Sequence, residues 1–246
     1  PLIEEQLTEI MRAGHNCVSS SEELCFPWLR YPEIADRLNA VAEEEVVACV
    51  GAGVNPGFVM DVLPVACAGV CVDVKAVRVT RIVDAASRRE PLQRKVGAGM
   101  TRQRFQALAA EEKIGHVGLI ESCAFIAQAL RLKIDRIEED LQPVIADRSI
   151  QTEFLAVEPG QVAGIHHVAR GMRGNECLAE LDLRMYVGAP EPRDEVAIQG
   201  RPELRVVVPG GTPGDFATVA ALVNMAPRAA ASEPGLKTAL DLPLRP

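Results

Sequence analysis

Apolar residues near the start of the chain recur first at helical spacing and then in short runs. Positions three and four apart are apolar over residues 2–13 and again from Pro32 to Ala42, which predicts two amphipathic helices. A short strand is expected at residues 16–19. The unbroken apolar run at 46–50 is typical of a buried parallel strand with helices on both faces. The order helix, strand, helix, strand predicts part of a doubly wound, Rossmann-like α/β sheet.

After Gly57 the pattern changes. We expect a buried helix over 58–70, kinked at Pro64, and further helices near 101–112, 117–132 and from Asp215. Apolar and polar residues alternate from Glu176 to Val187, which predicts a strand with one apolar face. Further strands are expected at 70–83, 196–198 and 204–208, and a surface tail from Pro227. This part predicts an α+β domain with a mainly antiparallel sheet and flanking helices.

These patterns predict three units. We expect an α/β unit over residues 1–57, an α+β domain over residues 58–212, and a C-terminal helix and tail over residues 213–246.

Charge and composition exclude several functions. The formal net charge is −8, which lacks the basic footprint of a nucleic-acid binder. No apolar run reaches the ~20 residues that span a bilayer, and the first residues do not form a signal peptide. Seven cysteines without a CxxC pair favour reduced thiols in a cytoplasmic protein over disulfides or a metal site. We therefore expect no nucleic-acid or membrane partner.

A glycine-rich segment, Gly51–Gly57, follows the second predicted strand. Ligands of open α/β sheets bind beyond the carboxyl ends of the strands, and glycine lets the backbone approach a ligand closely. A tight turn between domains explains the segment equally well. It is not a phosphate loop, since it lacks both the GxGxxG spacing and a following Lys-Ser/Thr pair.

A second candidate, Ser19 to Leu24, follows the first predicted strand and therefore faces the same edge. A carboxylate at Glu22 or Glu23 could act as a general acid or base, or hold a cationic substrate. The alternative is a helix cap, because Ser20 and Glu23 have the spacing of a capping box.

Three later segments contain polar groups. His116 opens a predicted helix on which Glu121 lies near an apolar face, so Glu121 needs a partner, for which Arg78 or Arg81 is expected. His166 and His167 are set aside as a proton-donor motif, because adjacent residues on a strand point to opposite faces. Asp215 is a candidate helix N-cap.

Four blocks taken together are more specific than any one: AGHNCVSSSEEL, GAGVNPGFVMDVLP, GHVGLIES and GGTPGDFATVAALVN. Their order and spacing resemble the 2,4-diaminopentanoate dehydrogenase and amine dehydrogenase family, whose cofactor domain is similar to that of dihydrodipicolinate reductase. The resemblance runs from about Ile3 to Pro246. Family members carry roughly a hundred further residues at the N-terminal side, with the GxGxxG loop, so the resemblance implies a truncated chain.

The resemblance implies a cytoplasmic homodimer that binds NAD or NADP and transfers hydride between the cofactor and an amine or imine. It implies that residues 1–57 are a partial Rossmann-like dinucleotide-binding domain and residues 58–212 the substrate-binding and dimerisation domain. It implies Glu23 as the catalytic carboxylate, with Glu22 as second choice, and His116 and Glu121 in the substrate pocket. The implied cofactor-binding residues are Ser20, Ser21, Gly53, Asn55, Pro56 and Gly57. The substrate is a small amine or ketone, and no metal is expected.

Two alternatives stay open. The chain could be a dimerisation or ligand-binding module without catalysis, since the pyrophosphate loop is absent from it. It could also be an imine reductase similar to dihydrodipicolinate reductase.

Overall fold

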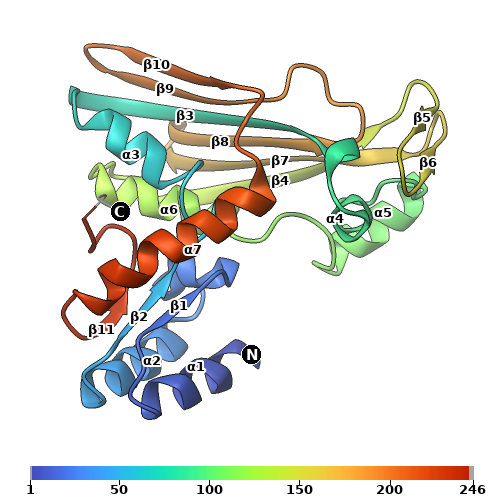
Figure 1. Ribbon diagram of the computed structural model, residues 1–246. Coiled ribbons are helices and arrows are strands. Elements are labelled where there is room, and N and C mark those ends of the chain that lie inside the picture. Colours follow the sequence, from blue (N-terminus) through green and yellow to red (C-terminus); the bar gives the residue numbers. More distant parts are fainter. Residues whose placement is uncertain (1, 244–246) are drawn as a thin grey trace.

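The computed structural model describes residues 2–243. A small parallel sheet has the order β1-β2-β11, formed by β1 (Cys17–Ser19), β2 (Ala48–Gly51) and β11 (Gly235–Lys237). Its core residues alternate between two faces: Cys49 and Leu236 pack on α1 (Leu2–Arg12) and α2 (Pro32–Glu44), whereas Ala48 and Val50 pack on α7 (Gly214–Ala230). Helices on both faces confirm the predicted Rossmann-like arrangement (Figure 1).

The larger sheet has six strands in the order β10-β9-β3-β8-β7-β4. Only the β3–β8 pair is parallel, so the sheet is mainly antiparallel, as predicted. Its strands are β3 (Val72–Asp84), β4 (Arg136–Ile145), β7 (Val162–Arg173), β8 (Glu176–Tyr186), β9 (Arg193–Arg201) and β10 (Leu204–Pro209).

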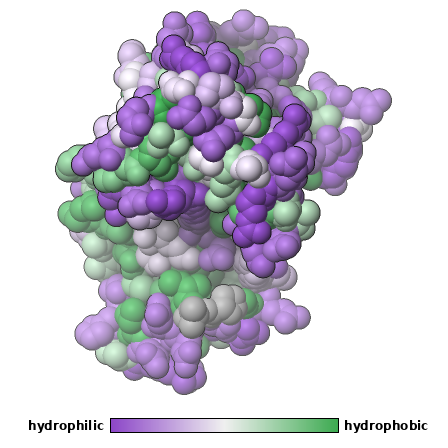
Figure 2. All heavy atoms as spheres, turned by 90° about the vertical axis from the view of Figure 1, so that its right-hand side faces the viewer, coloured by the Kyte–Doolittle hydropathy of each residue, from purple (hydrophilic) through white to green (hydrophobic). Residues whose placement is uncertain are grey.

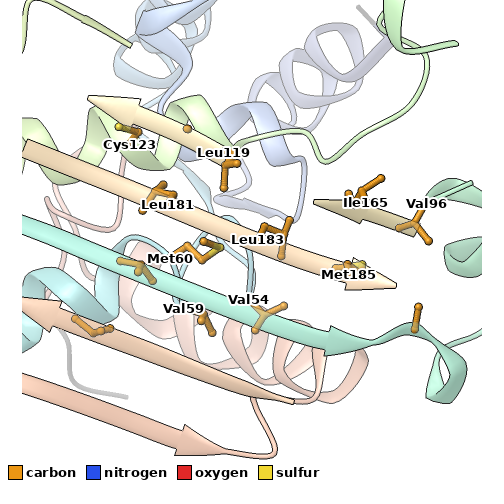
Figure 3. Packing of buried hydrophobic residues seen from close by; sticks show 14 of the residues in the cluster. Val54, Val59, Met60, Val96, Leu119, Cys123, Ile165, Leu181, Leu183 and Met185 are labelled. Atoms are coloured by element: carbon orange, nitrogen blue, oxygen red, sulfur yellow. The ribbon is translucent and has the colours of Figure 1, made fainter. Parts of the chain in front are cut away.

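One face of this sheet forms the main core. Leu181 and Leu183 on β8 are fully buried, as the predicted alternation requires. Helices α3 (Val62–Ala68) and α6 (Leu119–Ala129) cover this face. Val54 and Met60, from the segment after β2, also insert into this core (Figure 3). The glycine-rich segment is thereby anchored to the large sheet.

Smaller elements lie at one end of the large sheet (Figure 1). They are α4 (Glu90–Lys95), α5 (Arg102–Ala110) and the hairpin of β5 (Ile150–Gln151) and β6 (Ala156–Val157). On the side of the molecule that carries them, the surface is largely hydrophilic, with hydrophobic residues in separate small groups (Figure 2). No helix within residues 2–243 has the length and apolar character needed to cross a membrane.

Several local predictions need correction. The helix expected over 58–70 is shorter, and Pro64 lies in its first turn, where a missing N–H costs no helical hydrogen bond, so no kink follows. The tail from Pro227 does not simply cover the surface, because it supplies β11. Strand β4 was not predicted: its charged residues and Pro143 suit the sheet edge that it occupies and hide the alternation.

Candidate functional site

The two strand-end segments meet at one edge of the small sheet. Ser19 and Gly51 are paired in register, and the Ala52 N–H donates to the Ser19 carbonyl over 2.9 Å. The chain after β1 then turns back over β2, so that a Cβ on Gly51 would overlap the Leu24 carbonyl. Glycine at this position therefore allows the segment carrying Glu22 and Glu23 to lie directly on the end of β2.

The turn over Gly51–Gly57 is closed by backbone contacts that exclude side chains. A Cβ on Gly53 would lie 2.7 Å from the Pro56 carbonyl, and Gly57 has φ +121° and packs on the Gly53 backbone. Pro56 in turn packs on Gly118, which has φ +98° and precedes α6. The turn thus brings a third segment, the one carrying His116 and Glu121, to the same place.

Asn55, at the tip of this turn, has an unpaired side chain. Its Oδ1 and its Nδ2 are both buried, and neither has a hydrogen-bond partner among residues 2–243. Buried amides are normally paired, so this one offers a donor and an acceptor to a ligand. A carboxamide, such as that of nicotinamide, has the complementary pair.

A cavity of about 140 Å³ opens beside Asn55. Its polar lining includes Glu22, Asn55 and His116, together with the cations Arg81, Arg88 and Lys95. The volume suits a small molecule of a few heavy atoms. Glu22, Asn55 and His116 come from three separate predicted segments, and all three line this one cavity.

The two candidate carboxylates have different surroundings. Glu22 lines the cavity, where its carboxylate lies 3.4 Å from Lys95 Nζ; burial raises the pKa of Glu22, and Lys95 partly offsets that rise. Glu23 does not line this cavity, and its Oε2 accepts a hydrogen bond of 3.0 Å from the Ser21 hydroxyl. The capping-box alternative is wrong, since Ser21 is the residue before the short 3-10 helix Glu22–Cys25 and makes no capping bond.

Glu121 has a different partner from the one predicted. Its Oε1 lies 3.1 Å from Arg30 Nε, not beside Arg78 or Arg81. The side chain is 2% exposed, and its Oε2 has no partner in the described part of the chain. Burial raises the pKa of Glu121, and the nearby carboxylates of Glu139 and Glu23 add to the rise. Glu121 is therefore a buried carboxyl group near Glu23, and its Oε2 can accept a hydrogen bond from a ligand.

His116 lies in the loop before α6, which begins at Leu119 rather than at the histidine. Its Nε2 is buried, with no hydrogen-bond partner among the residues that the structure describes. Burial lowers the pKa of the ring to about 3, and Lys95 adds to the effect. His116 is therefore a neutral hydrogen-bonding group at physiological pH. Its backbone N–H donates to His167 Nδ1 over 3.3 Å. His167 Nε2 must then carry the proton that it shares with Glu139 at 3.0 Å.

The motif residues His166 and His167 point to opposite faces of β7, as the sequence predicts. His166 pairs with Asp182 on the outer face, and neither histidine lines the cavity. Asp215 is not a helix N-cap: it lies in the first turn of α7 and binds Arg88 and Arg89, each at 3.1 Å.

Sequence reasoning missed the cavity cations Arg88 and Lys95. Arg81 pairs with the buried Asp194 at 2.7 Å, but its Nε is buried and unpaired. The sequence spacing of Arg88 and Lys95 does not distinguish them from surface arginines and lysines. They reach the site only because the chain bends after β3.

Comparisons with known proteins agree with one another. The family model of the 2,4-diaminopentanoate dehydrogenase C-terminal domain matches residues 58–246. The chain is 31% identical over 249 residues to the 2,4-diaminopentanoate dehydrogenase of Acetoanaerobium sticklandii, covering 98% of this chain and 70% of that protein. It is 24% identical over 269 residues to the amine dehydrogenase of Streptomyces virginiae, covering 99% and 74%.

The fold is shared with a solved structure. The amine dehydrogenase from Mycobacterium smegmatis superposes with a TM-score of 0.86 at 23% identity, over 99% of this chain and 72% of that chain. This similarity supports the arrangement of both sheets.

Proposed function

Because the chain belongs to the 2,4-diaminopentanoate dehydrogenase family, we propose that it takes part in nicotinamide-dependent oxidation of a CH–NH2 group and in the reverse amination. Family membership confirms the predicted resemblance and makes the chain an oxidoreductase. The observation that carries the proposal is the cavity at one edge of the small sheet, where Glu22 lies with the Asn55 amide and Glu23 is its neighbour in the chain.

Each group has a defined part in this proposal. A bound nicotinamide supplies the hydride acceptor or donor. The Asn55 amide orients its carboxamide, with Ser20, Ser21, Gly53, Pro56 and Gly57 as the surrounding cofactor-binding backbone. Glu23, oriented by Ser21, or Glu22 in the cavity wall stabilises the cationic iminium form of the substrate and moves the proton during attack of ammonia or water. At ~4 Å such a charge pair is worth about 4 kcal/mol at an effective dielectric of 20.

His116 and Glu121 complete the substrate side. His116 stays neutral, so it offers a hydrogen bond without repelling the iminium ion. The free Oε2 of Glu121 is a second acceptor near Glu23 for an amino group.

The charge pattern supports an amine that also carries an acid group. Three cations, Arg81, Arg88 and Lys95, line the cavity against two carboxylates, Glu22 and Asp215. The buried Nε–H of Arg81 has no acceptor among residues 2–243. A substrate carboxylate is the natural acceptor for such donors. The amino end of the same molecule would face Glu22.

The test is amine-dependent reduction of NAD or NADP by the full-length protein. We expect turnover with 2,4-diaminopentanoate and a kcat/KM about 10- to 100-fold lower with 1,3-diaminobutane, which lacks the carboxylate, the usual worth of a charged hydrogen bond. Equal kcat/KM for both would contradict the acid-binding role of the cations. No reduction of either cofactor with any amine would contradict the function and favour a non-catalytic binding module.

The assembly and location stay proposals. We propose a homodimer, which sedimentation would show as twice the protomer mass. All seven cysteines are free thiols, which supports a reducing, cytoplasmic location that cell fractionation would check.

A further inference from the structure

A buried carboxylate, Asp61, contacts the segments of the candidate site but does not line its cavity. Its Oδ2 accepts three hydrogen bonds, from the Gly57 N–H at 2.7 Å, the Ser122 hydroxyl at 2.8 Å and the Cys25 thiol at 3.3 Å. Its Oδ1 accepts the Val62 N–H at 2.6 Å. The side chain is 0% exposed.

The surroundings of Asp61 are otherwise apolar. Cys25, Val62 and Phe125 form a buried cluster there, joined by Phe26 and Val65. A buried carboxylate is costly unless it is well hydrogen-bonded, and four donors at this position meet that need. Burial raises the pKa of Asp61, while the same four hydrogen bonds hold it down.

The three donors on Oδ2 come from the three segments that form the site. Cys25 ends the short helix that carries Glu22 and Glu23. Gly57 closes the turn that carries Asn55. Ser122 follows Glu121 on α6. Segments that are far apart in sequence are thus bonded to one oxygen atom.

Some functional atoms of the site are not fixed by hydrogen bonds of their own. Among residues 2–243, Asn55 has no partner for either amide atom, and Glu121, held by Arg30 at Oε1, has none for Oε2. Their placement therefore depends on the backbone that carries them, and Asp61 is the shared contact of that backbone.

We propose that Asp61 is a positioning residue that sets the distance between the carboxylate segment, the Asn55 turn and the start of α6. This role rests on the proposed function, because positioning has a consequence for turnover only if the site transfers hydride. A misplacement of about 1 Å can lower turnover about 100-fold.

The test compares Asp61→Asn, Ser122→Ala and Cys25→Ala in the full-length protein. Asparagine has nearly the same shape, but one of its two terminal groups is an amide –NH2. That group cannot accept the N–H hydrogen bond that the carboxylate oxygen accepts at the same position. We expect Asp61→Asn to lower kcat about 100-fold, with a smaller effect on KM for the cofactor. The deuterium isotope effect on kcat, with substrate labelled at the reacting carbon, should rise as hydride transfer becomes limiting. Each single-donor variant should lower kcat less than Asp61→Asn does.

Leu236→Ala is the stability control. Leu236 is 4% exposed on β11 and belongs to a different core cluster from Asp61's neighbours. We expect it to lower Tm while leaving kcat and the isotope effect near wild type. The proposal would be overturned if Leu236→Ala lost as much kcat as Asp61→Asn does. It would also be overturned if Asp61→Asn and both single-donor variants kept the wild-type kcat.

Hydrogen exchange tests the same inference without activity. In Asp61→Asn, amide exchange should rise together in residues 21–25, 53–57 and 118–122, and in Leu236→Ala it should not. An inactive wild-type protein would contradict the proposed function, whereas unchanged exchange in these three segments would contradict the anchoring by Asp61 itself.

Discussion

Unpaired buried polar atoms mark the candidate site at the residue scale. Such atoms occur on Asn55, His116 and Glu121, and all three were expected from the sequence to lie near a ligand. The sequence could flag them because short motifs surround them. It could not give the contacts that hold the site together: Arg30 pairs with Glu121, and Asp61 bonds Ser122, across long distances in the chain.

The pKa of His116 leads to a stability prediction. An unfolded imidazole titrates near 6.5, whereas folded His116 titrates at about 3. Between these values only the unfolded chain takes the proton, so the wild type should lose stability as pH falls from about 6.5 towards 3, by at most about 1.4 kcal/mol per pH unit. Urea unfolding from pH 4 to 7 should show His116→Gln lacking this loss, while His15→Gln, changed at an exposed site, keeps it. Parallel curves for wild type and His116→Gln would contradict a buried, neutral His116.

Element by element, the prediction worked where one periodicity ran undisturbed. Strand β2 and strand β8 were identified because their apolar residues are unbroken or alternate strictly. Strands β4 and β11 were missed. Charged residues and Pro143 mask the pattern of β4, and β11 has only one large apolar residue, Leu236, between a glycine and a lysine. The glycine turn was located, but its contact with Leu24 depends on how β1 and β2 pair.

Gly51 offers a test of that contact. Gly51→Ala places a methyl group against the Leu24 backbone, so one of the two segments must move. We expect a loss of about 1–3 kcal/mol in the free energy of unfolding, the usual cost of overpacking. Gly69→Ala is the matched control, because Gly69 also has a negative φ and only a 3.2 Å contact with one carbonyl at a helix end. Equal stability of the two variants in urea would show that the segments are not in contact.

For the whole molecule, the site belongs to both sheets. Arg30 and Glu22, from the chain before β2, pair with Glu121 and Lys95 from the chain after it. The fold class was predictable because each half has its own rhythm of strands and helices. These cross-pairs were not, because they depend on the orientation of one sheet relative to the other.

The most direct test of the account is the turnover of Glu23→Gln and Glu22→Gln in the full-length protein, with Glu44→Gln, on the exposed face of α2, as control. Glutamine keeps the shape of the side chain but can neither carry the negative charge nor move the proton. We predict that kcat for amine oxidation falls by roughly two to four orders of magnitude in Glu23→Gln, or in Glu22→Gln if the cavity-lining carboxylate is the catalytic one. Wild-type turnover in both variants would contradict a catalytic carboxylate at this edge of the sheet.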